Sequence, residues 1–158
     1  MGTTVSTIRP MLIEDVGDVV ILEQSHQPRP WSEQVFRDEL AAENRVYVVA
    51  EESGAVIGFG GVMVIGAEAH VTNLLVAADR RERGTGRALM IELIEAAIAR
   101  GARHLTLEVR KENEAARSLY SRMGMAPVGI RPRYYGDEDA LILWAHDIDT
   151  PGYRESLR

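Results

Sequence analysis

The sequence predicts an α+β fold in which a mixed central sheet of about seven strands is flanked by about four helices. Short runs rich in β-branched residues alternate with segments whose apolar residues recur every three or four positions, and no segment is repeated. A chain of 158 residues with 46% hydrophobic residues can build one compact core. We therefore expect a single domain over residues 1–149 and a flexible tail at 150–158, where no pattern is visible.

The N-terminal third is expected to hold one strand followed by two helices. Residues 5–11 have β-like composition, and apolar residues from Ile13 to Leu22 recur at helical spacing. Pro28-Arg29-Pro30 must break that helix, and Ser32 is a favourable N-cap for a second one.

Three strands are expected in the middle of the chain, over residues 46–50, 56–65 and 71–76. The first two are joined by a hairpin turn at Glu52-Ser53-Gly54, and Gly60-Gly61 interrupts the second. A strong helix follows over residues 88–99, and Gly101 stands in the position of a helix C-cap.

The last third begins with a strand over residues 105–109 and a helix over residues 114–123, which Gly124 ends. Asn113 is expected to cap that helix. Two final strands are expected over residues 126–130 and 141–145.

A glycine-bearing turn between the strand at 71–76 and the next helix favours binding of a phosphorylated cofactor. Gly84 and Gly86 leave the backbone open, and unpaired N–H groups at a helix start attract anions. The turn lacks the spacing of a Walker loop and carries two of the three glycines of a dinucleotide fingerprint, so a dinucleotide remains an alternative. A plain surface turn is the simplest interpretation of the turn taken alone.

Several motifs together resemble the Gcn5-related N-acetyltransferase (GNAT) superfamily, over about residues 5–146. Arg81-x-x-Gly84-x-Gly86 resembles its acyl-CoA pyrophosphate loop, and Asn113-x-x-Ala116-x-x-Leu119-Tyr120-x-x-x-Gly124 resembles its closing motif. The stretches Pro30-Trp31-Ser32, Leu107-Glu108-Val109-Arg110 and Arg131-Pro132-Arg133-Tyr134-Tyr135 are similar to the RimI type, which acetylates ribosomal-protein N termini. Pro132 departs from the usual arginine of that last motif.

The resemblance implies the GNAT fold, acetyl-CoA as cosubstrate without a metal, and a set of coenzyme-binding residues. The backbone of the strand at 71–76 would hold the acetyl and pantetheine portion, the turn would hold the diphosphate, and the asparagine before the last helix would also contact coenzyme A. On the matching positions these cofactor-binding residues are Leu74, Leu75, Val76, Arg81, Glu82, Arg83, Gly84, Thr85, Gly86, Arg87 and Asn113.

Glu108 and Tyr120 are the candidate catalytic residues. Strand alternation places Glu108 and Thr106 on the face opposite three aliphatic residues, although an ordinary solvent-facing glutamate is equally compatible. A partly dry cleft would raise the pKa of Glu108. Tyr120 lies on an apolar helix face, as a core tyrosine also would. The resemblance implies that Glu108 is the general base and Tyr120 the proton donor.

Trp31, Tyr134 and Tyr135 are candidates for the wall of the acceptor site. Pro-Trp-Ser at a helix start is more often a hydrophobic staple, whereas two adjacent tyrosines are hard to explain as core. The four histidines show no metal-ligand spacing.

Composition limits the partners. The chain has no cysteine, so cysteine nucleophiles and disulfides are excluded, and its net charge of −6 argues against general nucleic-acid binding but suits a cationic peptide. No apolar run approaches a membrane span, and no secretory signal is visible. We expect a cytoplasmic protein that is a monomer or weak dimer.

The leading hypothesis is transfer of the acetyl group of acetyl-CoA to the N-terminal alanine of a small-subunit ribosomal protein, by direct attack in a ternary complex. An α-amine is easier to deprotonate than a lysine by about 2.6 pKa units, or about 3.5 kcal/mol, which suits a single modest base. Acetylation of other N termini, lysines or small amines is an alternative, as is a non-catalytic coenzyme A-binding module.

Overall fold

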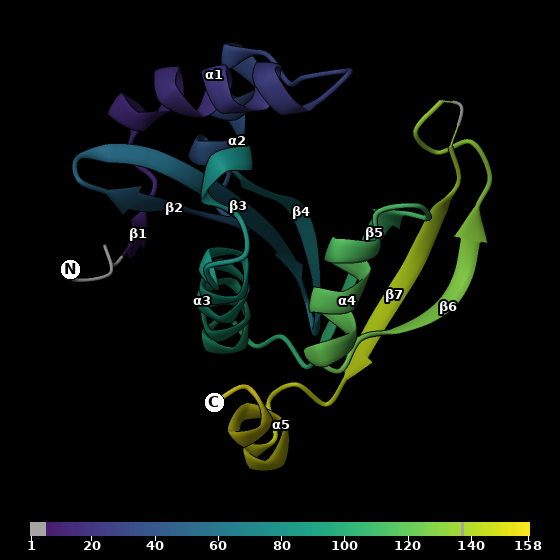
Figure 1. Ribbon diagram of the computed structural model, residues 1–158. Helices are drawn as coiled ribbons and strands as arrows, with labels where there is room; N and C mark the ends of the chain where they lie inside the picture. The colour runs from purple at the N-terminus through teal and green to yellow at the C-terminus, as the bar shows by residue number, and fades with distance from the viewer. Residues whose placement is uncertain (1–5, 137) are drawn as a thin grey trace.

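The computed structural model describes residues 6–136 and 138–158, so the expected start of the first strand at Val5 lies outside the described part (Figure 1). A seven-stranded mixed sheet forms its centre, as the sequence predicted, and its strand order is β1-β2-β3-β4-β5-β7-β6. The strands are β1 (Thr7–Pro10), β2 (Arg45–Glu52), β3 (Ala55–Ile65), β4 (Glu68–Val76), β5 (His104–Arg110), β6 (Ala126–Arg131) and β7 (Ala140–His146).

The helices agree with the sequence except near the ends of elements and in the C-terminal segment. The expected first helix divides into a 3₁₀ turn, Ile13–Asp15, and α1 (Val16–His26). The other described helices are α2 (Glu33–Ala41), a short 3₁₀ turn at Ala78–Arg80, α3 (Thr85–Ala99), α4 (Glu114–Arg122) and α5 (Pro151–Ser156). The side chains of Ser32 and Asn113 accept backbone N–H groups at the starts of α2 and α4, which confirms both predicted caps.

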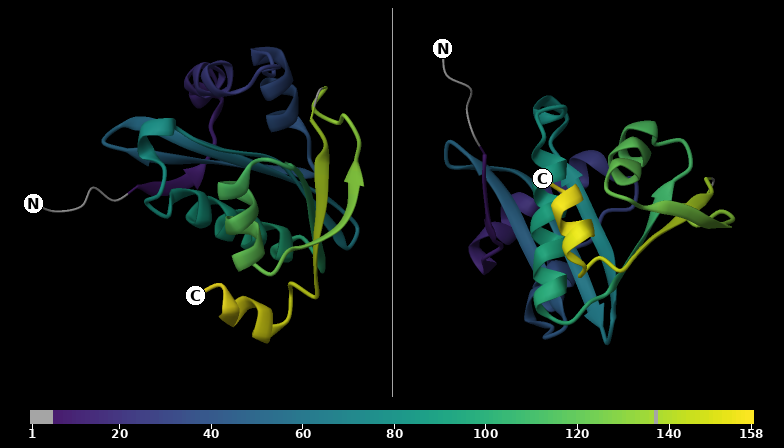
Figure 2. Two further views of the ribbon diagram at one scale, coloured as in Figure 1. Left: turned by 45° about the vertical axis from the view of Figure 1, so that its right-hand side comes forward. Right: turned by 90° about the horizontal axis from the view of Figure 1, so that it is seen from below.

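The helices cover the sheet on two sides (Figure 2). Helix α3 and the C-terminal end of α4 bury one face through a large cluster that includes Leu89, Leu93, Leu107 and Leu143. Helices α1 and α2 cover the other face over β2 to β4, through a smaller cluster around Phe36 and Phe59. No described helix is long and apolar enough to cross a membrane.

Strands β4 and β5 pair for only part of their length. Their parallel pairing joins Glu68–His70 with His104–Thr106 and ends there, whereas β5 continues along β7 as far as Arg110. Among the described strands, the second half of β4 therefore has β3 on one side and none on the other. Figure 1 shows the two strands separating, and this separation creates the opening in which the candidate site lies.

A β-bulge in β4 changes which residues face each side of the sheet. Gly61 is opposite Asn73, whereas the next residue, Val62, is opposite Val71, so Thr72 is an extra residue. Before the bulge Val71 packs in the cluster under α3, and after it Leu75 packs with α1 and α2. The simple alternation in the sequence could not reveal this change of phase.

The C-terminal segment differs from the flexible tail expected at 150–158. The Thr150 side chain accepts the Tyr153 N–H and Pro151 occupies the first turn, so α5 is a capped helix. It packs beside α3 (Figure 2), where Arg154 pairs with Glu95 and Leu157 is buried. Tyr153 donates to the carbonyl of Met123 over 2.7 Å, which ties α5 to the end of α4.

Candidate active site

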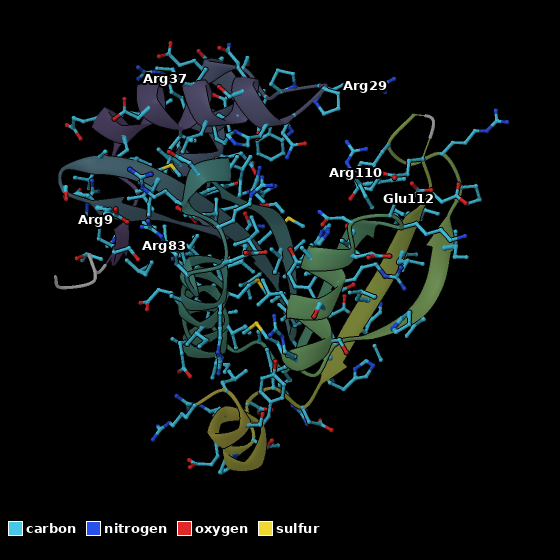
Figure 3. All side chains as sticks on the ribbon, in the orientation of Figure 1. Arg9, Arg29, Arg37, Arg83, Arg110 and Glu112 are labelled. Atoms are coloured by element: carbon cyan, nitrogen blue, oxygen red, sulfur yellow. The ribbon has the colours of Figure 1, made fainter. Side chains whose placement is uncertain are left out.

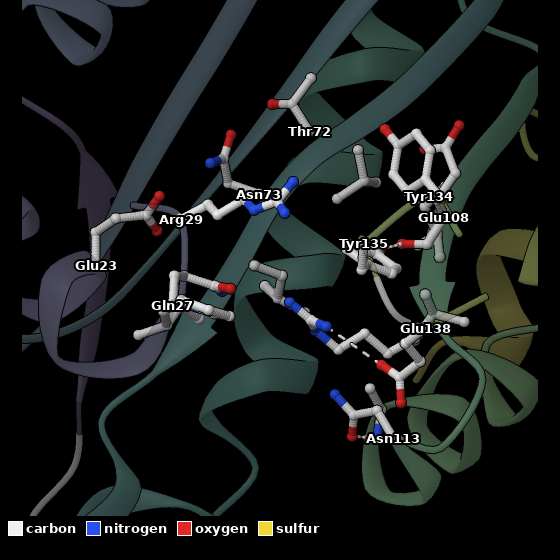
Figure 4. Close-up of a pocket in the computed structure, with 18 of the residues that line it drawn as sticks. Glu23, Gln27, Arg29, Thr72, Asn73, Glu108, Asn113, Tyr134, Tyr135 and Glu138 are labelled. Atoms are coloured by element: carbon white, nitrogen blue, oxygen red, sulfur yellow. Dashed lines mark hydrogen bonds and ion pairs between the residues drawn. The ribbon is translucent and has the colours of Figure 1, made fainter. Parts of the chain in front are cut away.

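A cavity of about 1380 Å³ lies where β4 and β5 separate (Figure 4). One wall comes from α1 and the segment that follows it, including Glu23, Gln27, Arg29 and Trp31. The floor comes from the bulged part of β4, and the opposite wall comes from β5, α4 and the β6–β7 loop. Figure 3 shows Arg29 and Arg110 projecting from facing sides of this opening.

Glu108 lines this cavity from β5. Its side chain is 9% exposed, and Oε2 lies 2.6 Å from Nε2 of His70 on β4. The two residues meet because His70 is in register with Thr106, the residue two before Glu108, on the last paired rung of β4 and β5. Arg131 approaches the other carboxylate oxygen at 3.8 Å. A charge-compensated carboxylate therefore stands at the point where the strands part.

The electrostatics of Glu108 correct one sequence-based expectation. The hydrogen bond from His70 holds the pKa of Glu108 below its ordinary value, and this effect exceeds the upward effect of burial. Arg131 lowers the pKa of Glu108 further. The expectation of a raised pKa is wrong because it counted the dry cleft and missed the imidazole. Glu108 is consequently ionised and able to accept a proton at neutral pH.

Tyr120 is buried on α4, on the face that packs into the core, and it also lines the cavity. Burial raises the pKa of Tyr120, so its hydroxyl keeps its proton at neutral pH. The two sequence-based interpretations of this residue, core tyrosine and proton donor, are therefore compatible.

The predicted acceptor wall is assembled from two loops. Trp31 packs against Phe36 at 5.4 Å and lines one side of the cavity, whereas Tyr134 and Tyr135 line the other. The Tyr135 hydroxyl donates to the carbonyl of Glu108 over 3.1 Å, and the Arg110 guanidinium lies 4.3 Å from its ring centre. These contacts hold the tyrosine loop next to the carboxylate.

The predicted coenzyme turn forms the entrance of α3, which begins three residues before the expected start at residue 88. Gly84 has φ of 82°, a left-handed conformation that a residue with a Cβ adopts at a cost, and Thr85 is the first helical residue. The first intrahelical bond runs from Ala88 to Gly84, so the preceding N–H groups have no acceptor inside the helix. A Cβ at Gly86 would make only ordinary contacts, at 3.5 Å or more. This entrance fits a diphosphate group.

The charged residues of the turn make protein contacts. Arg81 donates to the Val76 carbonyl over 3.1 Å, and Arg83 lies 3.3 Å from Glu52. Arg87 donates to the carbonyl of Leu157 in the C-terminal segment. Glu82 has φ of 64°, which makes the turn sharp before α3. The diphosphate fit consequently depends on the backbone of the turn more than on these side chains.

The strand Leu74–Val76 and Asn113 connect the turn to the cavity. Leu74 and Leu75 line the cavity together with Asn113, whose side chain accepts the Ala116 N–H. Beyond His70 one edge of β4 is not paired with β5, so its backbone groups are available to an extended ligand.

Sequence reasoning missed His70, Glu23 and Arg29. His70 depends on the register between two strands that are distant in sequence, and no local signal reports it. Glu23 could have been noticed, because its carboxylate falls on the buried face of α1 at the spacing of Val16 and Val19. The Arg29 guanidinium reaches the opposite loop, where a Cβ on Gly136 would lie 2.9 Å from Nη2.

Comparisons with known proteins agree with this geometry. Residues 17–125 match the Acetyltransferase (GNAT) family. The chain is 36% identical over 144 residues to a Bacillus subtilis (strain 168) protein named as a candidate ribosomal protein bS18-alanine N-acetyltransferase, covering 89% of this chain and 95% of that one. It is 34% identical over 142 residues to the Escherichia coli (strain K12) ribosomal protein bS18-alanine N-acetyltransferase, covering 87% and 95%.

A solved structure is similar over nearly the same span. The crystal structure of the ribosomal-protein-S18-alanine N-acetyltransferase from Escherichia coli superposes with a TM-score of 0.82 at 32% identity, covering 90% of this chain and 94% of that one.

Proposed function

We propose, from the premise that this chain belongs to the acetyltransferase (GNAT) family, that it acetylates the N-terminal alanine of a small-subunit ribosomal protein. The chain is an acetyl-CoA-dependent N-acetyltransferase. The finer assignment of the acceptor is supported by relatives that are named for this substrate and resemble the chain along most of its length. A cytoplasmic location and a monomeric or weakly dimeric state remain predictions.

The observation that carries the catalytic proposal is that Glu108 and Tyr120 reach the same cavity from different elements, β5 and α4. Amine acetylation needs a group that accepts the amine proton and a group that protonates the departing thiolate. We assign the first role to Glu108 and the second to Tyr120. His70 donates a hydrogen bond to Glu108 and holds its carboxylate in place.

Binding of the coenzyme is assigned to the turn and strand already described. The backbone N–H groups at the start of α3 would hold the diphosphate, because Gly84 and Gly86 have no side chains to cover them. The residues around these groups are Arg81, Glu82, Arg83, Thr85 and Arg87. The unpaired edge of Leu74–Val76 would hold the pantetheine arm, and Asn113 would border it. Acetyl-CoA supplies an activated thioester whose carbonyl carbon accepts the amine.

The acceptor is assigned to the part of the cavity between Trp31 on one side and Tyr134 and Tyr135 on the other. Four carboxylates line the cavity, at Glu23, Glu108, Glu112 and Glu138, against two arginines at Arg29 and Arg110. A cationic peptide start is therefore favoured over an anionic one. A low pKa of Glu108 also favours an α-amine, because a lysine costs about 3.5 kcal/mol more to deprotonate.

The proposal is tested with a panel of acceptors and labelled acetyl-CoA, followed by mass spectrometry. The panel holds a peptide that begins Ala-Arg, the same peptide with a blocked N terminus and an internal lysine, and a small polyamine. We expect label only on the α-amine of the first. Label on the lysine or the polyamine contradicts the acceptor assignment, and coenzyme binding without label on any amine contradicts the proposed reaction.

A further inference from the structure

Glu23 is a buried carboxylate on a helix face that is otherwise apolar. Val16 and Val19, on the same side of α1, are fully buried, and Glu23 is only 4% exposed. A buried carboxylate loses solvation free energy unless another group compensates its charge. The position therefore calls for a partner, either in the protein or in a ligand.

The protein supplies only part of that compensation. The backbone N–H of Trp31 donates to Oε2 of Glu23 over 2.9 Å. Among the described residues no lysine, arginine or histidine pairs with Glu23 within 4.0 Å. Glu108 is paired with His70 and Glu138 is paired with Arg110, so Glu23 differs from both of these cavity carboxylates.

Glu23 also faces the cavity and not the helix packing alone. It lines the cavity on the α1 side, and Figure 4 shows it across the opening from Glu108 and Tyr135. The nearby Arg29 reaches toward Gly136 on the opposite loop. A carboxyl group that no described basic side chain compensates thus faces the space that we assign to the acceptor.

We propose that Glu23 is an acceptor-binding residue that receives the protonated α-amine of the incoming peptide before Glu108 takes its proton. The inference rests on the proposed function, because it needs a peptide N terminus in the cavity. An ammonium group enters a site of reduced dielectric constant, where an unpaired carboxylate attracts it more strongly than in water. Burial raises the pKa of Glu23, and a bound cation would restore its ionised form.

The two carboxylates then have different tasks. Glu108 is already compensated by His70 and Arg131, which makes it a weak anchor for a second cation. Glu23 is uncompensated and binds the charged amine without removing its proton. Removing the Glu23 charge should therefore raise the KM for the peptide and leave kcat nearly unchanged.

A purely structural role for Glu23 is the competing explanation. Its bond to the Trp31 N–H could serve only to hold the segment after α1. Glu23→Gln separates the two roles, because a glutamine side-chain oxygen still accepts that N–H while the charge is gone. Asp18→Asn removes the same charge from an exposed position on the same helix and is the matched control.

The test measures binding of two peptides to the coenzyme A-saturated enzyme by calorimetry. One begins with a free Ala-Arg, and the other has the same sequence with an acetylated N terminus. We expect Glu23→Gln to weaken binding of the free-amine peptide about tenfold or more, with little change for the acetylated peptide and none for Asp18→Asn.

Three outcomes overturn the inference. If Glu23→Gln weakens binding of both peptides equally, Glu23 only positions the loop. If the substitution weakens binding of neither peptide, the charge of Glu23 is not used. If the loss of affinity in Glu23→Gln disappears when the second peptide residue is changed from arginine to glutamine, Glu23 binds the arginine side chain of the peptide and not its α-amine. Turnover by the wild-type enzyme is measured first, because failure to acetylate the free-amine peptide overturns the proposed function instead.

Discussion

His70 Nε2 and Glu108 Oε2 lie 2.6 Å apart where β4 and β5 separate, with His70 on the last paired rung and Glu108 two residues beyond it on β5. The contact joins an imidazole from one strand to a carboxylate from the next, at the point where the strands separate. It keeps Glu108 ionised in a largely buried position, where the carboxylate would otherwise tend to hold a proton.

The pH dependence of the reaction should report this contact. His70→Ala removes the largest effect that lowers the pKa of Glu108 and leaves burial, which raises it. Because the base must be ionised, the acidic limb of the kcat/KM profile should move to higher pH in the variant. Steady-state rates across pH for wild type and variant measure this shift.

His104→Gln is the control for that experiment. His104 lies on the same strand as Glu108 but contacts His146, so its removal should leave the acidic limb in place. If the acidic limb of the kcat/KM profile is also unshifted in His70→Ala, His70 does not set the ionisation of Glu108.

Tyr120→Phe should lower kcat by about 10²–10⁴-fold and leave the affinity for acetyl-CoA nearly unchanged. The phenol is buried and keeps its proton, and among the described residues no acceptor takes that proton up. Single-turnover rates and calorimetry measure the two quantities.

Tyr153→Phe is the matched control for Tyr120. The Tyr153 hydroxyl donates to Met123, and burial raises the pKa of Tyr153 to about 12, but the residue does not line the cavity. We expect this variant to lose about 1 kcal/mol of unfolding free energy and little rate. A Tyr120→Phe enzyme as fast as the Tyr153→Phe enzyme contradicts the proton-donor role.

Gly86→Ala should weaken the binding of acetyl-CoA without destabilising the fold. The new Cβ would meet only Leu119 and Val76, at ordinary contact distances, and alanine favours a helix over glycine by about 0.5–1 kcal/mol. The methyl group would nevertheless stand at the helix entrance where the diphosphate is assigned.

Thermal unfolding with and without acetyl-CoA tests this assignment. The ligand-free Tm should stay or rise, while the increase caused by the ligand should shrink. Gly17→Ala, in α1 with nothing within 4 Å of the new Cβ, should raise Tm and keep the full ligand effect. An undiminished ligand effect in Gly86→Ala places the diphosphate elsewhere.

Much of the fold could be predicted because its signals are local. Strand composition located all seven strands, and the caps at Ser32 and Asn113 follow from side chains that bond a backbone group three residues away. The C-terminal helix carried a local signal too, since Thr150-Pro151 is a cap followed by a proline in the first turn.

The site was less predictable because its main relationships are non-local. Glu108 and Tyr120 were found by resemblance to a family, whereas the partner of Glu108 depends on strand register across 38 residues. The bulge at Thr72 and the early end of the β4–β5 pairing leave no composition signal, although they open the cavity.

The bulge itself gives the last prediction, through Gly61. Tyr47 is buried and its hydroxyl bonds Glu39, Thr72 and Asn73, at 2.8, 3.2 and 3.2 Å, so it holds the bulged part of β4. A Cβ on Gly61 would lie 2.2 Å from the Tyr47 ring, which is buried and held by its hydroxyl bonds. Gly61→Ala should therefore cost about 1–3 kcal/mol of unfolding free energy.

The same substitution should lower activity, because the displaced Tyr47 ring can no longer hold Thr72 and Asn73, which line the cavity. Denaturant unfolding and steady-state rates measure both effects. Combining Gly61→Ala with Tyr47→Leu should restore part of the lost stability but not the rate, since the clash is relieved while the hydroxyl is absent. Additive losses of stability in the double variant contradict a direct contact between residue 61 and Tyr47 as the cause.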